Sequence, residues 1–302
     1  MGKTPEDLEA SRGKRVEILK EFGEIPQSII KAAFTRTAID MSADERKALR
    51  NPDAHVEKYG IMAKAFSMSN TKDNLTGCRG EGYKLSLFPQ NIGELVVKFY
   101  SKEGDTVVDP FAGHNSRMEL CWRLNRHYRG QDLSNDFMKA NYQIKEMLMA
   151  EKADDMFGNM YTATIELKHG DSRKLQYPNE FADFTLTSPP YWNLEHYGHE
   201  SEQLGKNTYE GFLESLQQVM AENFRCLKVG AFACWFVNDF RKDGKFYNYH
   251  GDCIRLMKEV GFTHYDMMIV DFGTSIRAAF ASQVIESQIL PKRHEYGLIF
   301  KK

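Results

Sequence analysis

The sequence predicts an α/β fold, in which a largely parallel β-sheet is covered by helices on both faces. The chain has 302 residues, 42% of them apolar and 27% charged, which is enough to bury the core of one large domain. From residue 85 onward, short apolar runs alternate with segments whose apolar residues repeat at helical spacing. Polar residues directly follow several of these runs, as they do at the ligand-binding edge of open α/β sheets.

Seven strands and five helices are expected in this part of the chain. The strands are expected at residues 106–108, 127–132, 163–167, 181–187, 231–237, 265–270 and 295–300. The helices are expected at residues 91–100, 118–125, 136–150, 209–227 and 252–259. Helices and strands therefore alternate through one continuous sheet domain, which we expect to span residues 85–302.

The first 84 residues have a different composition. Residues 1–60 are rich in charges and helix formers, with apolar residues at helical spacing, namely Val16, Leu19, Ile25, Ile29, Ile30 and Phe34. They are expected to form a helical N-terminal region. Residues 61–84 contain many Ser, Asn and Gly residues and are expected to be a linker or lid loop.

The net charge of −2 does not by itself indicate a nucleic-acid-binding protein, so any such surface must be a local patch. The candidate patches are Arg12 with Lys14 and Arg15, Arg46 with Lys47 and Arg50, Arg241 with Lys242 and Lys245, and Lys292 with Arg293. Acidic residues are interleaved with most of them, so each is expected to be an ordinary solvated surface.

The sequence also indicates a compartment. No run of 18 apolar residues is present, and the N-terminus lacks the apolar segment of a signal peptide, so no membrane association is expected. The five cysteines show no C-x-x-C spacing, which argues against structural zinc and disulfides and favours a cytoplasmic protein.

Four polar residues follow predicted strands, at Asp109, Asp132, Asp171 and Ser188. Asp132 lies nineteen residues after Gly113, the position at which an acid binds the ribose hydroxyls of an adenosine. Asp171 could accept a hydrogen bond from the adenine amino group. Each Asp could instead cap the helix that follows it.

The turn after Asp109 contains one glycine and lacks the G-x-G-x-x-G pattern that binds a pyrophosphate. Gly113 permits close backbone approach, and Asn115 tolerates positive φ better than most residues. This turn suits a smaller ligand with an amino-acid end, and S-adenosylmethionine is such a ligand.

A second motif, Thr187-Ser188-Pro189-Pro190-Tyr191-Trp192, follows the predicted strand at residues 181–187. Two adjacent prolines remove two backbone N–H donors, so the loop offers carbonyl oxygens and an aromatic ring. Such a loop suits a substrate amino group. Taken alone, it could also be an ordinary exit from a strand.

With these motifs, residues 85–302 resemble the S-adenosylmethionine-dependent DNA amino-methyltransferases that modify cytosine N4 or adenine N6. The resemblance rests on residues 85–89 (LSLFP), 109–113 (DPFAG), 187–192 (TSPPYW) and 292–296 (KRHEY). The overall arrangement resembles stand-alone phage or prophage methyltransferases. This chain departs from the family pattern at Asn115, where a second glycine is usual, and in placing the cofactor motifs before the catalytic one.

The resemblance implies a Rossmann-like sheet of seven strands and assigns the site residues. The cofactor-binding residues are expected to be Phe88, Pro89, Asp109, Pro110, Phe111, Ala112, Gly113, Asn115, Asp132, Leu133, Asp171, Ser172 and Ser188. The catalytic residues are expected to be Ser188, Pro189, Pro190 and Tyr191, with Tyr191 and Trp192 stacking on the base. No metal is expected, because His196, His199 and Glu200 form only a weak cluster, which is read as part of a loop over the base.

The expected substrate is double-stranded DNA in a bacterial or phage-infected cell. The Ser188 hydroxyl oxygen and the Pro189 carbonyl would accept the two amino hydrogens of a flipped base, while Tyr191 stacks on it. No cysteine follows a proline, which argues against carbon-5 methylation of cytosine. The Ser-Pro-Pro-Tyr form favours cytosine N4. Adenine N6, an RNA substrate and an inactive DNA-binding module remain alternatives.

The sequence leaves the partners less defined. Residues 1–60 are expected to contact DNA or to dimerise, and the loops at 193–205 and 270–285 are expected to contribute to DNA binding. A homodimer and a cognate restriction nuclease are both compatible with the family, and the sequence decides neither.

Overall fold

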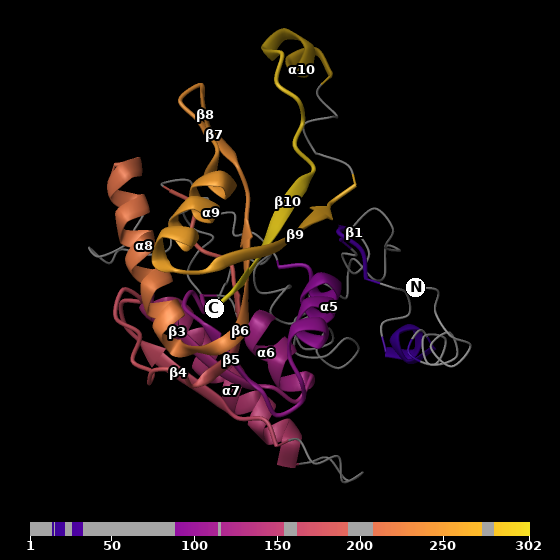
Figure 1. Ribbon diagram of the computed structural model, residues 1–302, viewed down its shortest axis with the longest axis vertical. Helices are drawn as coiled ribbons and strands as arrows, with labels where there is room; N and C mark the ends of the chain where they lie inside the picture. Colours follow the sequence, from indigo (N-terminus) through magenta and orange to yellow (C-terminus); the bar gives the residue numbers. More distant parts are fainter. Residues whose placement is uncertain are drawn as a thin grey trace, which may run out of the picture.

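The computed structural model describes residues 14, 16–21, 26–32, 88–113, 116–153, 162–192, 208–273 and 281–302. Its main sheet has eight strands in the order β1-β9-β10-β6-β5-β2-β3-β4 (Figure 1). The strands are β1 (Ile29–Lys31), β2 (Thr106–Asp109), β3 (His127–Asp132), β4 (Ile165–His169), β5 (Ala182–Thr187), β6 (Leu227–Val237), β9 (Thr263–Asp271) and β10 (His294–Lys301). The helices are α5 (Gln90–Tyr100), α6 (Ser116–Arg123), α7 (Asn135–Ala153), α8 (Tyr209–Cys226), α9 (Tyr249–Val260) and α10 (Ala281–Ser287).

The sheet is parallel except at β10, which runs antiparallel between β6 and β9. From β2 the chain moves outward through β3 to β4, then crosses back to β5 on the other side of β2. The strand order therefore reverses between β2 and β5. Ligands of open α/β sheets bind at such a point, outside the carboxyl ends of the strands.

Neighbouring residues of β2 pack on opposite faces of the sheet. Val107 packs with α5, α6 and α7, whereas its neighbour Val108 packs with α8 and α9. Helices therefore cover both faces, as Figure 1 shows. Each fully buried Val or Phe side chain contributes about 1.5 to 3 kcal/mol to this core.

A buried polar bridge ties α8 to the two strands that lead into the site. Asn223 donates from Nδ2 to the Thr185 hydroxyl on β5 (2.6 Å) and accepts from the indole nitrogen of Trp235 on β6 (3.3 Å). At the start of α8, the Thr208 hydroxyl caps the helix by accepting from the Gly211 amide. The bridge fixes β5 and β6 against one helix.

The expected α/β class is confirmed, and each of the seven expected strands is present. An eighth strand, β1, lies where helical spacing predicted a helix, because the pair Ile29 and Ile30 adds in parallel to the edge of β9. Residues 14 and 16–21 are helical. None of the helices that the structure describes is long and apolar enough to cross a membrane.

A small hairpin was not predicted. Strands β7 (Phe240–Lys242) and β8 (Lys245–Tyr247) pair antiparallel after β6 and form a separate two-stranded sheet. Their turn is Asp243-Gly244, and both residues have positive φ, 50° and 77°. An Asp-Gly pair between two short runs is a strong hairpin signal, and here it sets the turn.

Candidate active site

Asp109 lies at the carboxyl end of β2 and its side chain is fully buried. One carboxylate oxygen accepts hydrogen bonds from the Thr187 hydroxyl (2.6 Å) and the Phe111 amide (3.1 Å). The other accepts from Arg117 Nε (2.7 Å) and from the Tyr128 hydroxyl (2.8 Å). Asp109 thus joins the loop after β2 to the end of β5, directly before the Ser-Pro-Pro motif.

Two partners of Asp109 are themselves buried, and sequence reasoning missed both. Burial lowers the pKa of Arg117, but the charge of Asp109, the neighbouring Tyr128 and the hydrogen bond to Asp109 together outweigh burial and leave the pKa raised. Burial, followed by the Asp109 charge, raises the pKa of Tyr128 well above its usual value, so its hydroxyl remains a donor. A buried carboxylate that is paired and fully hydrogen-bonded holds its neighbours in one geometry.

The loop that follows Asp109 is held from several sides. The Pro110 carbonyl accepts from the buried Ser172 hydroxyl (2.5 Å), and the Ala112 carbonyl accepts from Asn141 Nδ2 on α7 (2.7 Å). The guanidinium of Arg117 donates to the Phe111 carbonyl (2.5 Å). The backbone between Asp109 and Gly113 is therefore fixed before any ligand arrives.

Gly113 ends the described part of this loop, in close contact with its neighbours. A Cβ at this position would lie 3.2 Å from the Phe137 ring and 3.3 Å from Asp132 Oδ2. A side chain would crowd both, so the glycine keeps the loop next to the carboxylate of Asp132. The loop after β2 and the carboxylate at the end of β3 therefore lie side by side.

Asp132 ends β3, as predicted, and is half-buried. Its Oδ1 accepts from the Ser134 amide (2.8 Å), which fixes the side chain near Gly113. The adjacent Leu133 carbonyl accepts from His169 Nε2 (2.8 Å), so the turns after β3 and β4 are linked.

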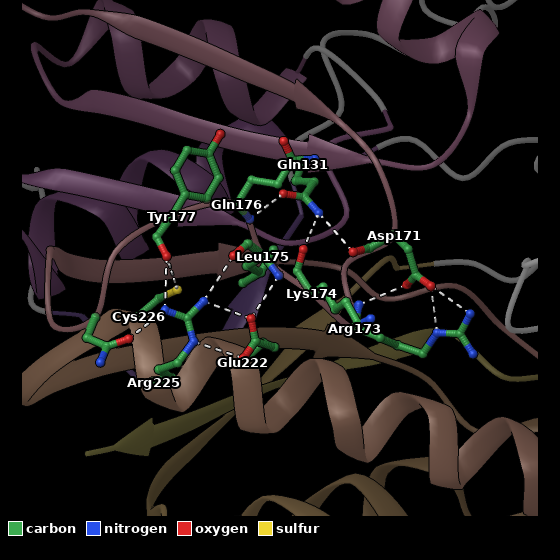
Figure 2. Close-up of polar contacts among 11 residues, drawn as sticks. Gln131, Asp171, Arg173, Lys174, Leu175, Gln176, Tyr177, Glu222, Arg225 and Cys226 are labelled. Carbon is green, nitrogen blue, oxygen red and sulfur yellow. Dashed lines mark hydrogen bonds and ion pairs between the residues drawn. The ribbon is translucent and has the colours of Figure 1, made fainter.

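Asp171 is bound within its own turn (Figure 2). Its carboxylate accepts from the Arg173 amide (2.9 Å) and pairs with the Arg173 guanidinium (2.6 Å), while Gln131 Nε2 donates to its carbonyl (2.9 Å). Arg225 on α8 braces the same turn by donating to the carbonyls of Leu175 and Tyr177. The carboxylate is thus already paired, and its predicted contact with adenine would have to form beside Arg173.

In the loop after β5, Ser188 Oγ donates to the carbonyl of Phe236 on β6 (3.2 Å). Because the Ser188 hydroxyl donates its proton to the Phe236 carbonyl, the lone pairs of its oxygen remain available to accept hydrogen bonds. Pro189 is buried, and the Pro190 carbonyl accepts from the Tyr249 hydroxyl (3.2 Å). The loop is therefore anchored on both sides of its first proline, Pro189.

Tyr191 and Trp192 are both partly exposed and both belong to an aromatic cluster over β6, α8 and α9. The Tyr191 hydroxyl donates to the buried Glu295 on β10 (3.2 Å), and its ring lies 6.0 Å from the ring of Tyr249. Trp192 packs 5.2 Å from Tyr247 of the hairpin. Glu295 is a further residue that sequence reasoning did not assign to the site.

Phe88 and Pro89 directly precede α5, and Phe88 contacts residues that support both loops. The Phe88 ring packs edge-on against Phe236 (5.0 Å), and the guanidinium of Arg117 lies over it at 5.7 Å. Pro89 is the N-cap of α5. Phe88 therefore contacts both the strand that holds Ser188 and the arginine that holds Asp109.

Several predicted residues lie outside the described part of the chain, among them Asn115, His196, His199 and Glu200. The loop at residues 193–205 and most of residues 1–60 also lie outside it. Among the residues that the structure does describe, no three His, Cys, Asp or Glu side chains group as a metal site would require.

Residues 19–145 match a family described as DNA methylase. The match contains β1, the Asp109 loop and Asp132, but ends before Ser188. It also begins inside the N-terminal region, which agrees with the place of β1 in the sheet.

Two curated relatives are methyltransferases. The chain is 24% identical over 110 residues to the orphan methyltransferase M.BamHII of Bacillus amyloliquefaciens, a stretch that covers 36% of this chain and 42% of that protein. It is 30% identical over 77 residues to the type II methyltransferase M.HindIII of Haemophilus influenzae, covering 26% of this chain and 25% of that protein. The chain thus spans less than half the length of these relatives.

Similar solved structures include S-adenosylmethionine-dependent methyltransferases from Methanosarcina mazei and Aquifex aeolicus. The first is 13% identical with a TM-score of 0.46, covering 72% of this chain and 99% of that one. The second is 15% identical with a TM-score of 0.42, covering 70% and 89%. The matching family and both curated relatives are thus DNA methylases or methyltransferases.

Proposed function

We propose that this chain transfers a methyl group from S-adenosylmethionine to the exocyclic amino group of a base flipped out of DNA, with cytosine N4 as the target. The observation that carries the proposal is the hydrogen bond from the Ser188 hydroxyl to the Phe236 carbonyl. It leaves the Ser188 oxygen free to accept an amino hydrogen at the strand-end position where ligands bind.

The chemistry explains why acceptors are needed. An exocyclic amino group is a weak nucleophile, because its lone pair is delocalised into the ring. Ser188 Oγ and the Pro189 carbonyl would each accept one amino hydrogen, which draws the nitrogen toward tetrahedral geometry and directs its lone pair at the methyl group. The cofactor, when bound, would supply an electrophilic methyl group on a sulfonium; transfer to the amino nitrogen would leave a neutral thioether and release the extra amino proton to solvent.

The cofactor would lie along the loop from Asp109 to Gly113. Asp132 would accept from the ribose hydroxyls, because its carboxylate lies beside Gly113. The buried Asp109 carboxylate would act by positioning, because all four of its hydrogen bonds are internal. The same carboxylate holds Thr187, so the cofactor loop and the acceptor loop are fixed relative to each other.

Tyr191 would stack on the flipped base. Flipping costs a few kcal/mol, and stacking on an aromatic ring returns about 1 to 3 kcal/mol per base. The bond to Glu295 and the contact with Tyr249 hold the Tyr191 ring in place. Trp192 packs against the rings of Tyr209 and Tyr247, which supports a packing role for it.

The cysteines favour amino methylation over carbon-5 methylation, which requires a thiolate nucleophile. Burial raises the pKa of Cys226 to about 11 and also raises the pKa values of Cys121, Cys234 and Cys253. A catalytic thiol needs the opposite shift. Cys78 lies outside the described residues.

The proposal is tested by incubating the protein with duplex DNA and a labelled methyl donor and analysing the nucleosides by mass spectrometry. The expected product is N4-methylcytosine. N6-methyladenine would reassign the base, and label found only in RNA would reassign the substrate. Recovery of 5-methylcytosine, or cofactor binding with no transfer to any nucleic acid, would overturn the proposal.

The role of Ser188 is tested by Ser188→Ala. Loss of one positioned hydrogen bond to the reacting group should lower kcat on the order of 10²-fold, with little change in DNA affinity. Ser101→Ala is the matched control, because the Ser101 hydroxyl also donates to a backbone carbonyl, that of Val97, near the amino end of β2. A wild-type rate for Ser188→Ala would contradict the assigned role.

A further inference from the structure

The β7–β8 hairpin carries an unbalanced positive charge. Arg241, Lys242 and Lys245 lie on its two short strands, and its only acidic residue is Asp243 in the turn. Arg241 and Lys245 are exposed and Lys242 is partly exposed. Within the described part of the chain, none of these three cations is paired with a carboxylate, unlike Arg173, Arg225 and Arg293.

The hairpin is packed against the acceptor loop. Phe240 and Tyr247, from its two strands, stack at 5.0 Å with nearly parallel rings. Tyr247 in turn lies 5.2 Å from Trp192, and Lys242 Nζ lies 4.3 Å above the Trp192 ring. Lys242 is therefore held next to the loop that contains Ser188 and Tyr191.

Aromatic rings also hold the other two cations. The guanidinium of Arg241 lies 5.3 Å from the centre of the half-exposed Phe246 ring, and Lys245 Nζ lies 5.0 Å from that of Tyr247. Such contacts orient a long cationic side chain while its donors still face solvent. Figure 1 shows the hairpin projecting beyond the edge of the main sheet at which β6 ends.

We propose that the β7–β8 hairpin binds the phosphates of the DNA strand that flank the flipped base. The inference rests on the proposed function, which requires a polyanion beside Ser188. The whole chain has a net charge of −2, so attraction to DNA must come from a local surface, and these three cations pair with no carboxylate of the described residues. A base held by Tyr191 brings its neighbouring phosphates to the same edge of the sheet, within the reach of long side chains.

The test compares two triple variants that remove the same charge. Arg241→Gln with Lys242→Gln and Lys245→Gln removes the cations of the hairpin. Lys98→Gln with Lys102→Gln and Lys228→Gln removes three cations near the amino ends of β2 and β6, at the opposite edge of the sheet. Binding of a fluorescent DNA duplex is measured from about 50 to 300 mM salt by anisotropy, a range over which phosphate contacts change affinity strongly. Binding of S-adenosylmethionine, measured by calorimetry, reports on folding.

The hairpin variant should bind DNA on the order of 10 to 10² times more weakly near 0.1 M salt. The slope of log K against log salt should fall by about 0.9 for each phosphate that the variant no longer neutralises, while the control variant keeps the wild-type slope. If the triple variant fails to bind the cofactor, the double variant Arg241→Gln with Lys245→Gln retains the packing of Lys242 on Trp192 and should still show a smaller slope.

The outcomes separate this inference from the proposed function. Wild-type affinity and slope in the hairpin variants, or equal losses of affinity in the control, would overturn the hairpin as a phosphate-binding element while leaving methyl transfer intact. A wild-type protein that binds DNA through the hairpin but forms no N4-methylcytosine would support the hairpin and contradict the proposed target. A wild-type protein that does not bind duplex DNA would overturn both.

Discussion

The two halves of the candidate site are formed by different kinds of side chain. On the β2–β4 side, buried polar groups bond to one another, as the four hydrogen bonds to Asp109 show. On the β5–β6 side, partly exposed aromatic rings and cationic side chains lie beside the loop that begins with Ser188, as the contacts of Trp192 with Tyr247 and Lys242 show. The first half is fixed in advance and the second presents groups to solvent. Substitutions in the first should therefore act on stability and cofactor binding, and those in the second on DNA binding and transfer.

The largest effect is expected for Asp109→Ala. The change leaves the guanidinium of Arg117 buried without its carboxylate, and breaking a buried ion pair on one side costs about 3 to 5 kcal/mol. Urea denaturation should show this loss in the free energy of unfolding.

The double variant Asp109→Ala with Arg117→Met is the companion measurement. It removes both charges, so it should recover part of the loss, and only part because the hydroxyls of Thr187 and Tyr128 still lack their acceptor. If Asp109→Ala unfolds at the wild-type urea concentration, the β2–β4 side is not held together by this network.

A smaller effect is expected for Asp132→Ala. Loss of a charge-assisted hydrogen bond to the ribose should weaken S-adenosylmethionine binding by about 1.5 to 3 kcal/mol. Asp271→Ala is the matched control, since Asp271 also ends a strand and also accepts from the amide two residues later, that of Gly273. Calorimetry on both folded variants measures their affinity for S-adenosylmethionine. If Asp132→Ala binds the cofactor as tightly as Asp271→Ala does, Asp132 is not part of the cofactor site.

The contrast between the two halves also explains what the sequence could predict. The seven strands and the positions of Asp109, Asp132, Asp171 and Ser188 follow from apolar runs and the residues after them, which are local patterns. Arg117, Tyr128 and Glu295 could not be assigned, because their importance comes from partners 8, 19 and 104 residues away along the chain. A buried Arg or Glu has no local signature until its partner is known.

The same reasoning applies to the two unpredicted pieces of strand. β1 has apolar residues whose spacing also fits a helix, and only the edge of β9 selects a strand. The hairpin was predictable in principle from Asp243-Gly244, but its runs of three residues are too short for a periodicity argument.

Tyr191→Ala probes the second half. Loss of stacking should weaken productive base binding by about 1 to 3 kcal/mol, seen as slower methyl transfer at subsaturating DNA. A duplex with a mismatched target base is cheaper to flip and should partly restore the rate. Tyr191→Phe keeps the ring and removes the hydroxyl that bonds to Glu295, so its rate should lie close to that of the wild type. If both variants slow methyl transfer equally, the hydroxyl of Tyr191 rather than its ring supports the reaction.

The smallest effect is expected for alkylation of the cysteines in the folded protein. The absence of a reaction would itself argue against a catalytic thiolate. The thiolate is the reactive form of cysteine, and with a pKa raised to about 11 the thiol of Cys226 is ionised to roughly one part in 10³ at pH 8. Burial raises the pKa values of Cys121, Cys234 and Cys253 as well and blocks access to all four thiols. Peptide mass spectrometry after iodoacetamide should find these four unmodified until urea unfolds the chain, with methyl transfer retained. Rapid labelling of any of them in the folded protein, accompanied by loss of transfer, would show a thiolate at the site and return carbon-5 chemistry to consideration.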